Sequence, residues 1–267
     1  MLRVSALYVY PIKSCREIAV SNARVEPRGF RFDRRFMLVD ANGRFLTQRQ
    51  LPAMALLETA IDGDALHVAR PDGGRFTVPL RPSFAESVQV RVWRSTLEAA
   101  VAGADVNAWF SESLGAPVRL VYMAEHHHRR VCANRARRSD DEVSFADGAP
   151  VLLIGEGSLA DLNARLAEPV SMLRFRPNIV VDAGAAFLED TWRRIRIGAA
   201  EFEVAWACSR CTITTVDPAT GRVDETGEPL ATLRGYRRDG AGILFGQNLL
   251  TRGAGTVSVG DEIEVLE

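Results

Sequence analysis

The sequence predicts a mainly β fold with some α-helix, of the α+β class. Short apolar and β-branched runs, separated by polar turns, fill the first hundred residues and return between residues 149 and 267. A helix-like segment and a long polar stretch lie between these two β-rich regions. Short strands at such close spacing are typical of antiparallel barrels or sandwiches.

The composition is that of an ordinary soluble globular protein. The 267 residues can form one large domain or two small ones, with 47% hydrophobic and 25% charged residues. The net charge of −1 gives no general reason to expect nucleic acid or a membrane surface as a partner. No run approaches the roughly 20 apolar residues that span a bilayer, and the N-terminus lacks a signal-peptide pattern. Four cysteines are too few for a disulfide scaffold, so we expect a cytoplasmic protein with reduced thiols.

In the first β-rich region, alternating or apolar runs between turn residues predict eight strands. They are residues 2–10, 18–27, 35–40, 45–47, 55–61, 65–68, 76–79 and 88–93. A helix follows over residues 105–114, with Asp105 as its N-cap and Gly115 as the stop. A further strand is predicted over residues 118–123.

The polar stretch over residues 125–142 predicts a long loop. It contains three consecutive histidines from His126 and five arginines. Consecutive side chains diverge in an extended chain, so we expect exposed loop histidines rather than metal ligands. No functional role is assigned to residues 125–147.

The second β-rich region begins with a strand over residues 151–154. Ser158 is predicted to cap a helix that runs to about residue 167. Four strands then follow at residues 178–181, 201–207, 212–216 and 243–250, and residues 255–266 predict a closing strand pair.

Cys208 and Cys211 stand three residues apart with Arg210 between them, which leaves several chemistries open. A zinc ribbon needs a second pair, but Cys15 and Cys132 stand alone. A thioredoxin-type pair needs a helix at its first cysteine, whereas residues 212–216 favour a strand. A single thiolate ligand to a soft metal remains open, beside the simpler alternative of two core cysteines.

Residues 155–160 match the G-x-G-x-x-A pattern of a dinucleotide-binding turn. Asp182 lies 27 residues beyond Gly155, against an expected spacing of about 20, and only one βαβ-like unit is visible. These departures weaken a nucleotide site. A milder hypothesis remains, that the helix N-terminus near Ser158 holds a phosphate.

Three short segments concentrate cations and amide donors. Lys13 and Ser14 end the first strand, Asp33 and Arg34 begin the third, and residues 174–178 carry two arginines and Asn178. Each segment alone is typical of a solvated turn. Together they suit an anionic ligand that accepts hydrogen bonds. No G-x-S-x-G, P-loop or H-E-x-x-H motif supports a hydrolase or a phosphoryl-transfer enzyme.

Four ordered motifs resemble the MOSC proteins, in particular those that join an N-terminal β-barrel domain to a MOSC domain. These include the mitochondrial amidoxime-reducing component and its bacterial counterparts. The motifs are LYVYPIKSC over residues 7–15, FDRRFMLVD over 32–40, FRPNIV over 175–180 and ACSRCTITTVDP over 207–218. The resemblance covers nearly the whole chain.

The resemblance implies two domains and a cofactor. It implies an N-terminal β-barrel-like domain over residues 1–120 and a MOSC β-barrel domain with peripheral helices over residues 121–267, with the terminal strands free to cross between them. It implies a molybdenum cofactor of the molybdopterin type, with Cys211 as the metal ligand and catalytic residue. The cofactor-binding residues implied or expected are Lys13, Ser14, Arg34, Ser158, Arg176, Asn178, Ser209 and Arg210.

The resemblance further implies a molybdenum-dependent oxidoreductase that reduces N-hydroxylated compounds such as amidoximes, hydroxylamines and N-hydroxylated bases. No four-cysteine iron–sulfur spacing is present. We therefore expect a separate electron donor, namely a flavin reductase, a ferredoxin-like protein or a cytochrome b5-like protein, and a monomeric chain.

Two alternatives stay open. MOSC domains also occur in molybdenum-cofactor sulfurases, so the chain is alternatively a cofactor carrier or sulfur-transfer module. The second alternative is a pyridoxal-phosphate- or nucleotide-binding protein built on residues 155–160. Pyridoxal phosphate usually needs a lysine for its Schiff base, and Lys13 is the only lysine in the chain.

Overall fold

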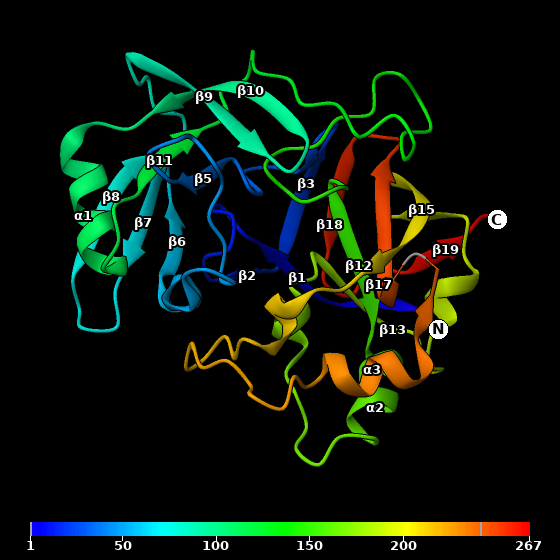
Figure 1. Ribbon diagram of the computed structural model, residues 1–267. Coiled ribbons are helices and arrows are strands. Elements are labelled where there is room, and N and C mark those ends of the chain that lie inside the picture. Colours follow the sequence, from blue (N-terminus) through cyan, green and yellow to red (C-terminus); the bar gives the residue numbers. More distant parts are fainter. Residues whose placement is uncertain (1, 241) are drawn as a thin grey trace.

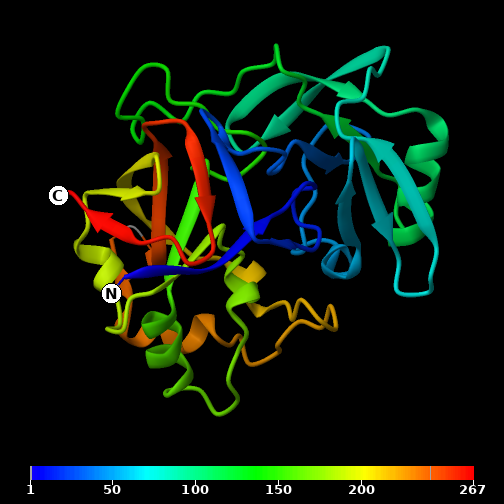
Figure 2. The ribbon, with the colours of Figure 1, turned by 180° about the vertical axis from the view of Figure 1, so that it is seen from behind.

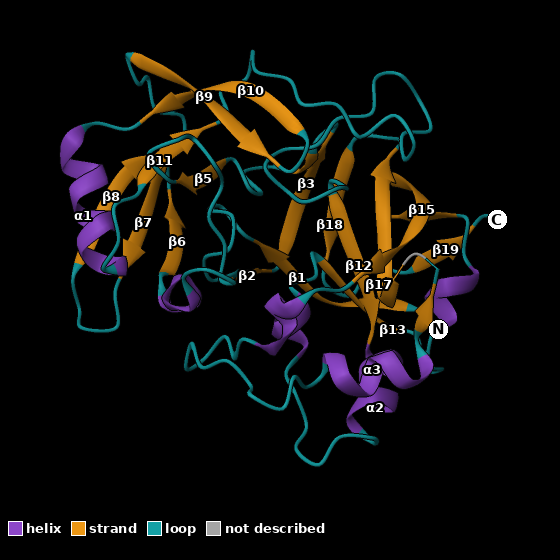
Figure 3. Cartoon of the chain, in the orientation of Figure 1, coloured by secondary structure: helices purple, strands orange, loops and turns teal. Residues whose placement is uncertain are grey.

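The computed structural model describes residues 2–240 and 242–267, and it confirms a mainly β fold with some α-helix (Figures 1 and 3). One sheet has nine strands, and three smaller sheets have four, three and three. Within the described residues the strand order of each sheet is an open path, and an isolated bridge from Arg3 to Glu262 links β1 to the residue before β19. No helix in this part of the chain is long and apolar enough to cross a membrane.

The lobe at the left of Figure 1 contains two of the small sheets. Their strands are β5 (Phe36–Val39), β6 (Glu58–Asp62), β7 (Ala65–Ala69), β8 (Arg75–Pro79), β9 (Glu86–Val92), β10 (Ser95–Val101) and β11 (Arg119–Tyr122). Helix α1 (Ala104–Leu114) buries Val106, Phe110 and Leu114 in the core of this lobe. Its N-cap is Gly103 rather than the predicted Asp105, and Gly115 ends it at φ 61° as predicted.

The larger lobe is built on the nine-stranded sheet. Its strands are β1 (Arg3–Val9), β2 (Ile18–Val20), β12 (Val151–Gly155), β13 (Ile179–Asp182), β14 (Arg194–Ile197), β15 (Ala200–Ser209), β16 (Arg238–Asp239), β17 (Gly242–Thr251) and β19 (Ile263–Val265). Helices α2 (Glu156–Asn163) and α3 (Leu230–Tyr236) lie together at the lower end of this lobe (Figure 1). The four 3-10 helices are η1 (Pro52–Leu56), η2 (Met172–Phe175), η3 (Leu188–Thr191) and η4 (Thr212–Thr215).

The beginning of the chain belongs to the larger lobe. Strand β1 pairs with β13, and β3 (Asn22–Glu26) pairs with β18 (Gly255–Ser258) and β4 (Gly29–Phe30). Figure 2 shows β3 in blue beside β18 in red, between the two lobes. The turns that follow β1 and β4 are therefore placed where the lobes meet.

Several predicted elements differ from the structure. Residues 45–47 form only an isolated bridge, residues 55–61 begin as η1, and residues 18–27 divide into β2 and β3. The strands within residues 255–266 pair with β3 and β14 rather than with each other. Strands β10 and β14 and helix α3 have no counterpart in the prediction.

The predicted strand over residues 212–216 is wrong, because Thr212–Thr215 forms the 3-10 helix η4. The Thr214 hydroxyl donates to the Cys211 carbonyl at 3.0 Å, and the Thr215 hydroxyl donates to the Thr212 carbonyl at 2.8 Å. Threonine hydroxyls that bond to nearby carbonyls stabilise local turns in competition with a sheet. The β-branched composition thus predicted the wrong element.

Candidate functional site

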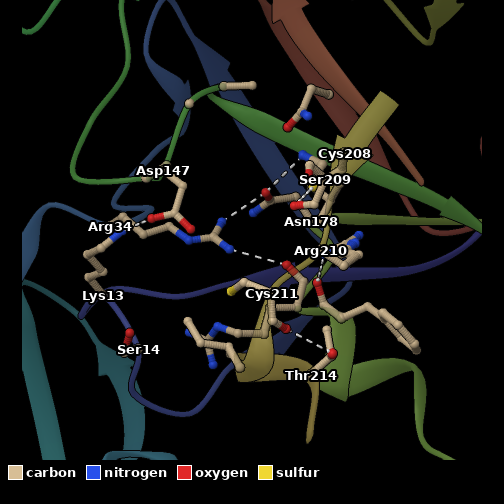
Figure 4. Close-up of a pocket in the computed structure, with 18 of the residues that line it drawn as sticks. Lys13, Ser14, Arg34, Asp147, Asn178, Cys208, Ser209, Arg210, Cys211 and Thr214 are labelled. Carbon is tan, nitrogen blue, oxygen red and sulfur yellow. Dashed lines mark hydrogen bonds and ion pairs between the residues drawn. The ribbon is translucent and has the colours of Figure 1, made fainter. Parts of the chain in front are cut away.

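A cavity of about 120 Å3 lies where the two lobes meet (Figure 4). It receives Lys13 and Ser14 from the turn after β1, Arg34 from the turn after β4, Arg176 and Asn178 from the segment before β13, and Ser209, Arg210 and Cys211 from the end of β15. All eight of these residues were predicted from the sequence to belong to one site, and in the structure they line one cavity.

A buried polar network fixes one wall of this cavity. Asp33, 1% exposed, accepts from the Tyr10 amide at 2.9 Å and from Arg34 Nη1 at 2.6 Å. Asn178, also 1% exposed, donates to Asp33 at 3.1 Å and accepts from Arg34 Nη1 at 2.9 Å. The guanidinium groups of Arg34 and Arg176 stack on the Tyr10 ring, at 4.2 and 4.3 Å from its centroid. The network holds two cations side by side in a buried place.

Three of the lining residues have a left-handed backbone although none is glycine. The φ angles are 67° at Ser14, 47° at Arg34 and 55° at Arg176. Such conformations are uncommon for residues with a Cβ and cost of order 1–3 kcal/mol each, and they cluster at functional sites. Their gathering around one cavity indicates a surface shaped for a ligand.

Asp147, which sequence analysis did not select, anchors the only lysine. Its carboxylate binds Lys13 Nζ and accepts from Trp93 Nε1 at 3.1 Å. Desolvation by the surrounding protein raises the pKa of the Asp147 carboxyl, although its side chain is 56% exposed, but the charge of Lys13 and the hydrogen bonds from Lys13 and Trp93 outweigh this effect and hold the pKa below its usual value. Burial lowers the pKa of Lys13, and Asp147 opposes that effect. The ion pair keeps the Lys13 ammonium group at the edge of the cavity with a carboxylate as its partner.

Cys211 presents its sulfur at the cavity beside a cation. Arg49 Nη1 lies 3.8 Å from Cys211 Sγ, and Figure 4 shows the Cys211 side chain between Arg34 and Thr214. The neighbouring Arg210 donates to the carbonyls of Phe245 at 2.7 Å and Phe175 at 2.9 Å. Its Nη2 atom is buried and has no hydrogen-bond partner in the described part of the chain.

The other cysteines are less suited to ligand chemistry. Burial raises the pKa of the Cys208 thiol, against the opposing charge of Arg210, and raises the pKa of the buried Cys15 thiol to about 12. Cys132 is exposed in the loop after β11. Within residues 2–240 and 242–267, no group of three or more His, Cys, Asp and Glu side chains gathers to hold a metal ion.

Ser158 lies outside the cavity, and its prediction as an N-cap is wrong. It sits inside α2, whose N-cap is Gly155, and it is fully buried. Its hydroxyl donates to Glu189 at 2.7 Å, and the Gly155 amide donates to the same carboxylate oxygen at 3.0 Å. The Glu189 carboxylate therefore takes the place of an anion at the start of this helix.

A wider groove of about 780 Å3 adjoins the cavity. Residues 44–50, the turn between β9 and β10, the 129–135 segment and Trp206 line it, and it shares Asp147, Gly148, Cys208, Ser209 and Asn248 with the cavity. We call it the arginine–tryptophan groove. Its residues are scattered along the chain and match no motif, so the sequence gives no signal for this groove.

Comparison with known proteins matches two family models. Residues 1–117 match the MOSC N-terminal beta barrel domain, and residues 140–264 match the MOSC domain. The chain is 35% identical to mitochondrial amidoxime-reducing component 1 of Homo sapiens, over 98% of this chain and 82% of that protein. It is 34% identical to mitochondrial amidoxime reducing component 2 of Rattus norvegicus, over 97% of this chain and 82% of that protein. It is 32% identical to a molybdenum cofactor sulfurase of Oryza sativa subsp. japonica, over 92% of this chain but 32% of that protein.

Proposed function

Because the chain belongs to the MOSC family, with both a MOSC N-terminal β-barrel domain and a MOSC domain, we propose that it is a molybdenum-cofactor-dependent reductase of N-hydroxylated compounds. Its similarity to amidoxime-reducing components extends over nearly the whole chain and over 82% of their length. The relatives' names supply the substrate class, and the cavity supplies the physical argument.

The observation that carries the proposal is the Cys211 sulfur, which lies in a cavity with unmatched cations. Arg176 and Arg210 form no ion pair with a carboxylate within the described residues. A molybdenum cofactor carries a phosphate, ring donors and acceptors, and a dithiolene. The unmatched guanidinium groups suit the phosphate, and a thiolate completes a soft sulfur set around the metal. The donor set and the unpartnered Arg210 Nη2 therefore fit this group.

We assign the roles as follows. Cys211 supplies the metal ligand, and Arg49 places an N–H donor beside its sulfur. Lys13, Arg34 and Arg176 form the cationic wall that binds the cofactor's anionic part, while Asn178 and Asp147 hold Arg34 and Lys13 in place. When bound, the cofactor supplies the redox chemistry: the N–O bond breaks, two electrons and two protons are consumed, and the oxygen leaves as water. A separate protein supplies the electrons.

The experiment compares two cysteine variants of the cofactor-loaded protein. With reduced methyl viologen as donor and benzamidoxime as substrate, we expect Cys211→Ser to lose at least about 100-fold in kcat, because a metal ligand is removed. Molybdenum content measured on the same samples separates loss of cofactor from loss of turnover.

Cys208→Ser is the matched comparison, since Cys208 lies three residues away and lines the same cavity. We expect it to retain bound molybdenum and measurable reductase activity. Full activity of the Cys211→Ser protein would contradict the proposal.

A second function follows from the similarity to the sulfurase, which spans about a third of that protein. A cofactor carrier or sulfur-transfer module would hold molybdenum and show no turnover of benzamidoxime with reduced methyl viologen. The same assay on the unmodified protein therefore separates the two functions.

A further inference from the structure

The arginine–tryptophan groove carries an excess of positive charge that no carboxylate balances. Six arginines line it, namely Arg44, Arg49, Arg91, Arg94, Arg129 and Arg135. None of them forms an ion pair in the described part of the chain. The one acidic lining residue, Asp147, already binds Lys13 and Trp93. A concave surface with unmatched charge of one sign attracts a ligand of the opposite sign.

The groove also presents indole rings in contact with these cations. The Arg49 guanidinium lies 4.9 Å from the Trp93 ring centroid, and the Arg135 guanidinium lies 5.2 Å from the Trp206 centroid. Trp93 is 44% exposed, unusual for so large an apolar side chain. Flat guanidinium and indole faces offer stacking surfaces for a planar ring.

The backbone holds Trp93 in this position at a cost. Trp93 and Arg94 form the two-residue turn between β9 and β10, since Val92 pairs with Ser95. The φ angle of Trp93 is 55°, which favours glycine in a hairpin turn. Contacts with the Phe45 ring at 5.1 Å and with Asp147 fix the indole beside the groove. A strained tryptophan beside an unmatched charge indicates a functional surface.

The groove leads to the proposed reaction centre. Arg49 stacks on Trp93 and reaches to 3.8 Å from Cys211 Sγ, so one side chain joins the groove to the sulfur. The volume of about 780 Å3 is within the range of small-molecule sites. A molecule lying in the groove can therefore extend one end toward Cys211 and keep its remainder among the arginines and tryptophans.

We propose that this groove binds the anionic aromatic part of the substrate, so that the protein prefers N-hydroxylated compounds whose ring carries a carboxylate or phosphate over their neutral analogues. The proposal rests on the reductase function above and names the substrate class within it. The anionic group stays unchanged in the reaction, which consumes the N–O bond at the other end of the molecule.

The test uses 4-carboxybenzamidoxime and benzamidoxime, which differ by one carboxylate. Affinity is measured from the tryptophan fluorescence of the purified protein, and kcat/KM is measured on the cofactor-loaded protein with reduced methyl viologen. We expect the carboxylate to bind at least about ten-fold more tightly at low salt, since each exposed ion pair contributes up to about five-fold and several arginines act together. The preference should fall as ionic strength rises.

The variant Arg94→Gln/Arg135→Gln removes two groove cations that touch neither Cys211 nor the cavity. We expect it to lose about ten-fold in affinity and in kcat/KM for the carboxylate probe, and less than about two-fold for the neutral one. Arg75→Gln, an exposed arginine on β8 outside the groove, is the matched control and should retain the preference.

Equal affinity and equal kcat/KM for the two probes would overturn the proposal. So would a double variant that loses rate equally with both probes when an acidic protein donor replaces methyl viologen, since the groove would then serve the donor. Failure of the proposed function looks different, because neither probe would be reduced although the fluorescence titration still reports their binding.

Discussion

The cavity and the arginine–tryptophan groove share a wall but differ in how firmly their side chains are held by hydrogen bonds. In the cavity, Asn178 is 1% exposed, and its side chain makes four hydrogen bonds, to the Asp33 carboxylate, the Arg34 guanidinium and the backbones of Tyr8 and Leu152. In the groove, Arg94 and Asn134 are exposed side chains with no fixed partner in the described residues. The cavity wall has a fixed shape, whereas part of the groove wall can rearrange.

The two surfaces suit two different tasks. A cofactor has one shape and remains bound, so a rigid wall whose polar groups are mostly hydrogen-bonded holds it with little loss of entropy on binding. Substrates vary in shape and must leave, so exposed arginines on loops suit them better. Asp147 belongs to both surfaces, since it holds Lys13 at the cavity and Trp93 at the groove.

The largest expected difference between the two surfaces is in stability. Asn178→Ala leaves Asp33 and Arg34 buried with fewer partners, which should cost about 3–5 kcal/mol of unfolding free energy. Asn134→Ala makes the same chemical change in the groove and should leave stability unaltered. Urea unfolding of both proteins measures this. Similar losses of unfolding free energy in the two variants would show that the groove is held as rigidly as the cavity.

The cavity could be predicted from the sequence because its residues sit in short motifs next to strand ends. Lys13 follows β1 and Asn178 precedes β13, so pairing of these two strands brings them together. The prediction of Ser158 as an N-cap was wrong for a related reason. Its hydrogen-bond partner Glu189 lies 31 residues further along the chain, and no local sequence pattern shows that pairing.

The groove could not be predicted because long-range pairing assembles it. Arg44 meets Arg91 through an isolated bridge, and Arg129 reaches the carbonyls of Ser144 and Ala146. The turn at Trp93 and Arg94 lacks the glycine or asparagine that marks a hairpin, so β10 was missed as well. The turn that hides β10 in the sequence is thus the same turn that holds Trp93 in a strained backbone conformation.

A buried ion pair anchors the loop that forms part of the groove wall. Asp141 and Arg252 form an ion pair with side chains only 4% and 6% exposed, and this pair joins residues 125–147 to the residue that follows β17. Asp141→Asn should cost about 2–3 kcal/mol at pH 7, since a buried charge-assisted bond is lost. It should also weaken binding of the carboxylate probe, because the 129–135 wall depends on this anchor.

The pH dependence of this variant checks the cause. Burial raises the pKa of Asp141, but the Arg252 hydrogen bond and the Arg137 and Arg138 amides lower it further, so the net pKa lies below its usual value. The stabilisation is therefore present above about pH 4 and is lost as the pH falls through the lowered pKa. The stability difference between the original protein and Asp141→Asn should shrink below pH 4. Asp161→Asn, in an exposed pair with Arg165, should show a much smaller difference at every pH.

The smallest expected change in stability, with a clear change in binding, is at Trp93. Glycine accepts a φ of 55° freely, so Trp93→Gly relieves about 1–3 kcal/mol of backbone strain while it loses contacts of similar size with Phe45 and Arg49. Unfolding free energy should change by less than about 1 kcal/mol. Affinity for 4-carboxybenzamidoxime should fall about three- to ten-fold through loss of ring contact, measured by isothermal titration calorimetry because the variant lacks one of the two indoles that line the groove. Trp93→Phe keeps a ring and the strain, so it should retain most of the affinity.

A loss of more than about 2 kcal/mol of unfolding free energy in the glycine variant, with binding of the probe intact, would mean that Trp93 is a packing residue and that the groove is no more adaptable than the cavity.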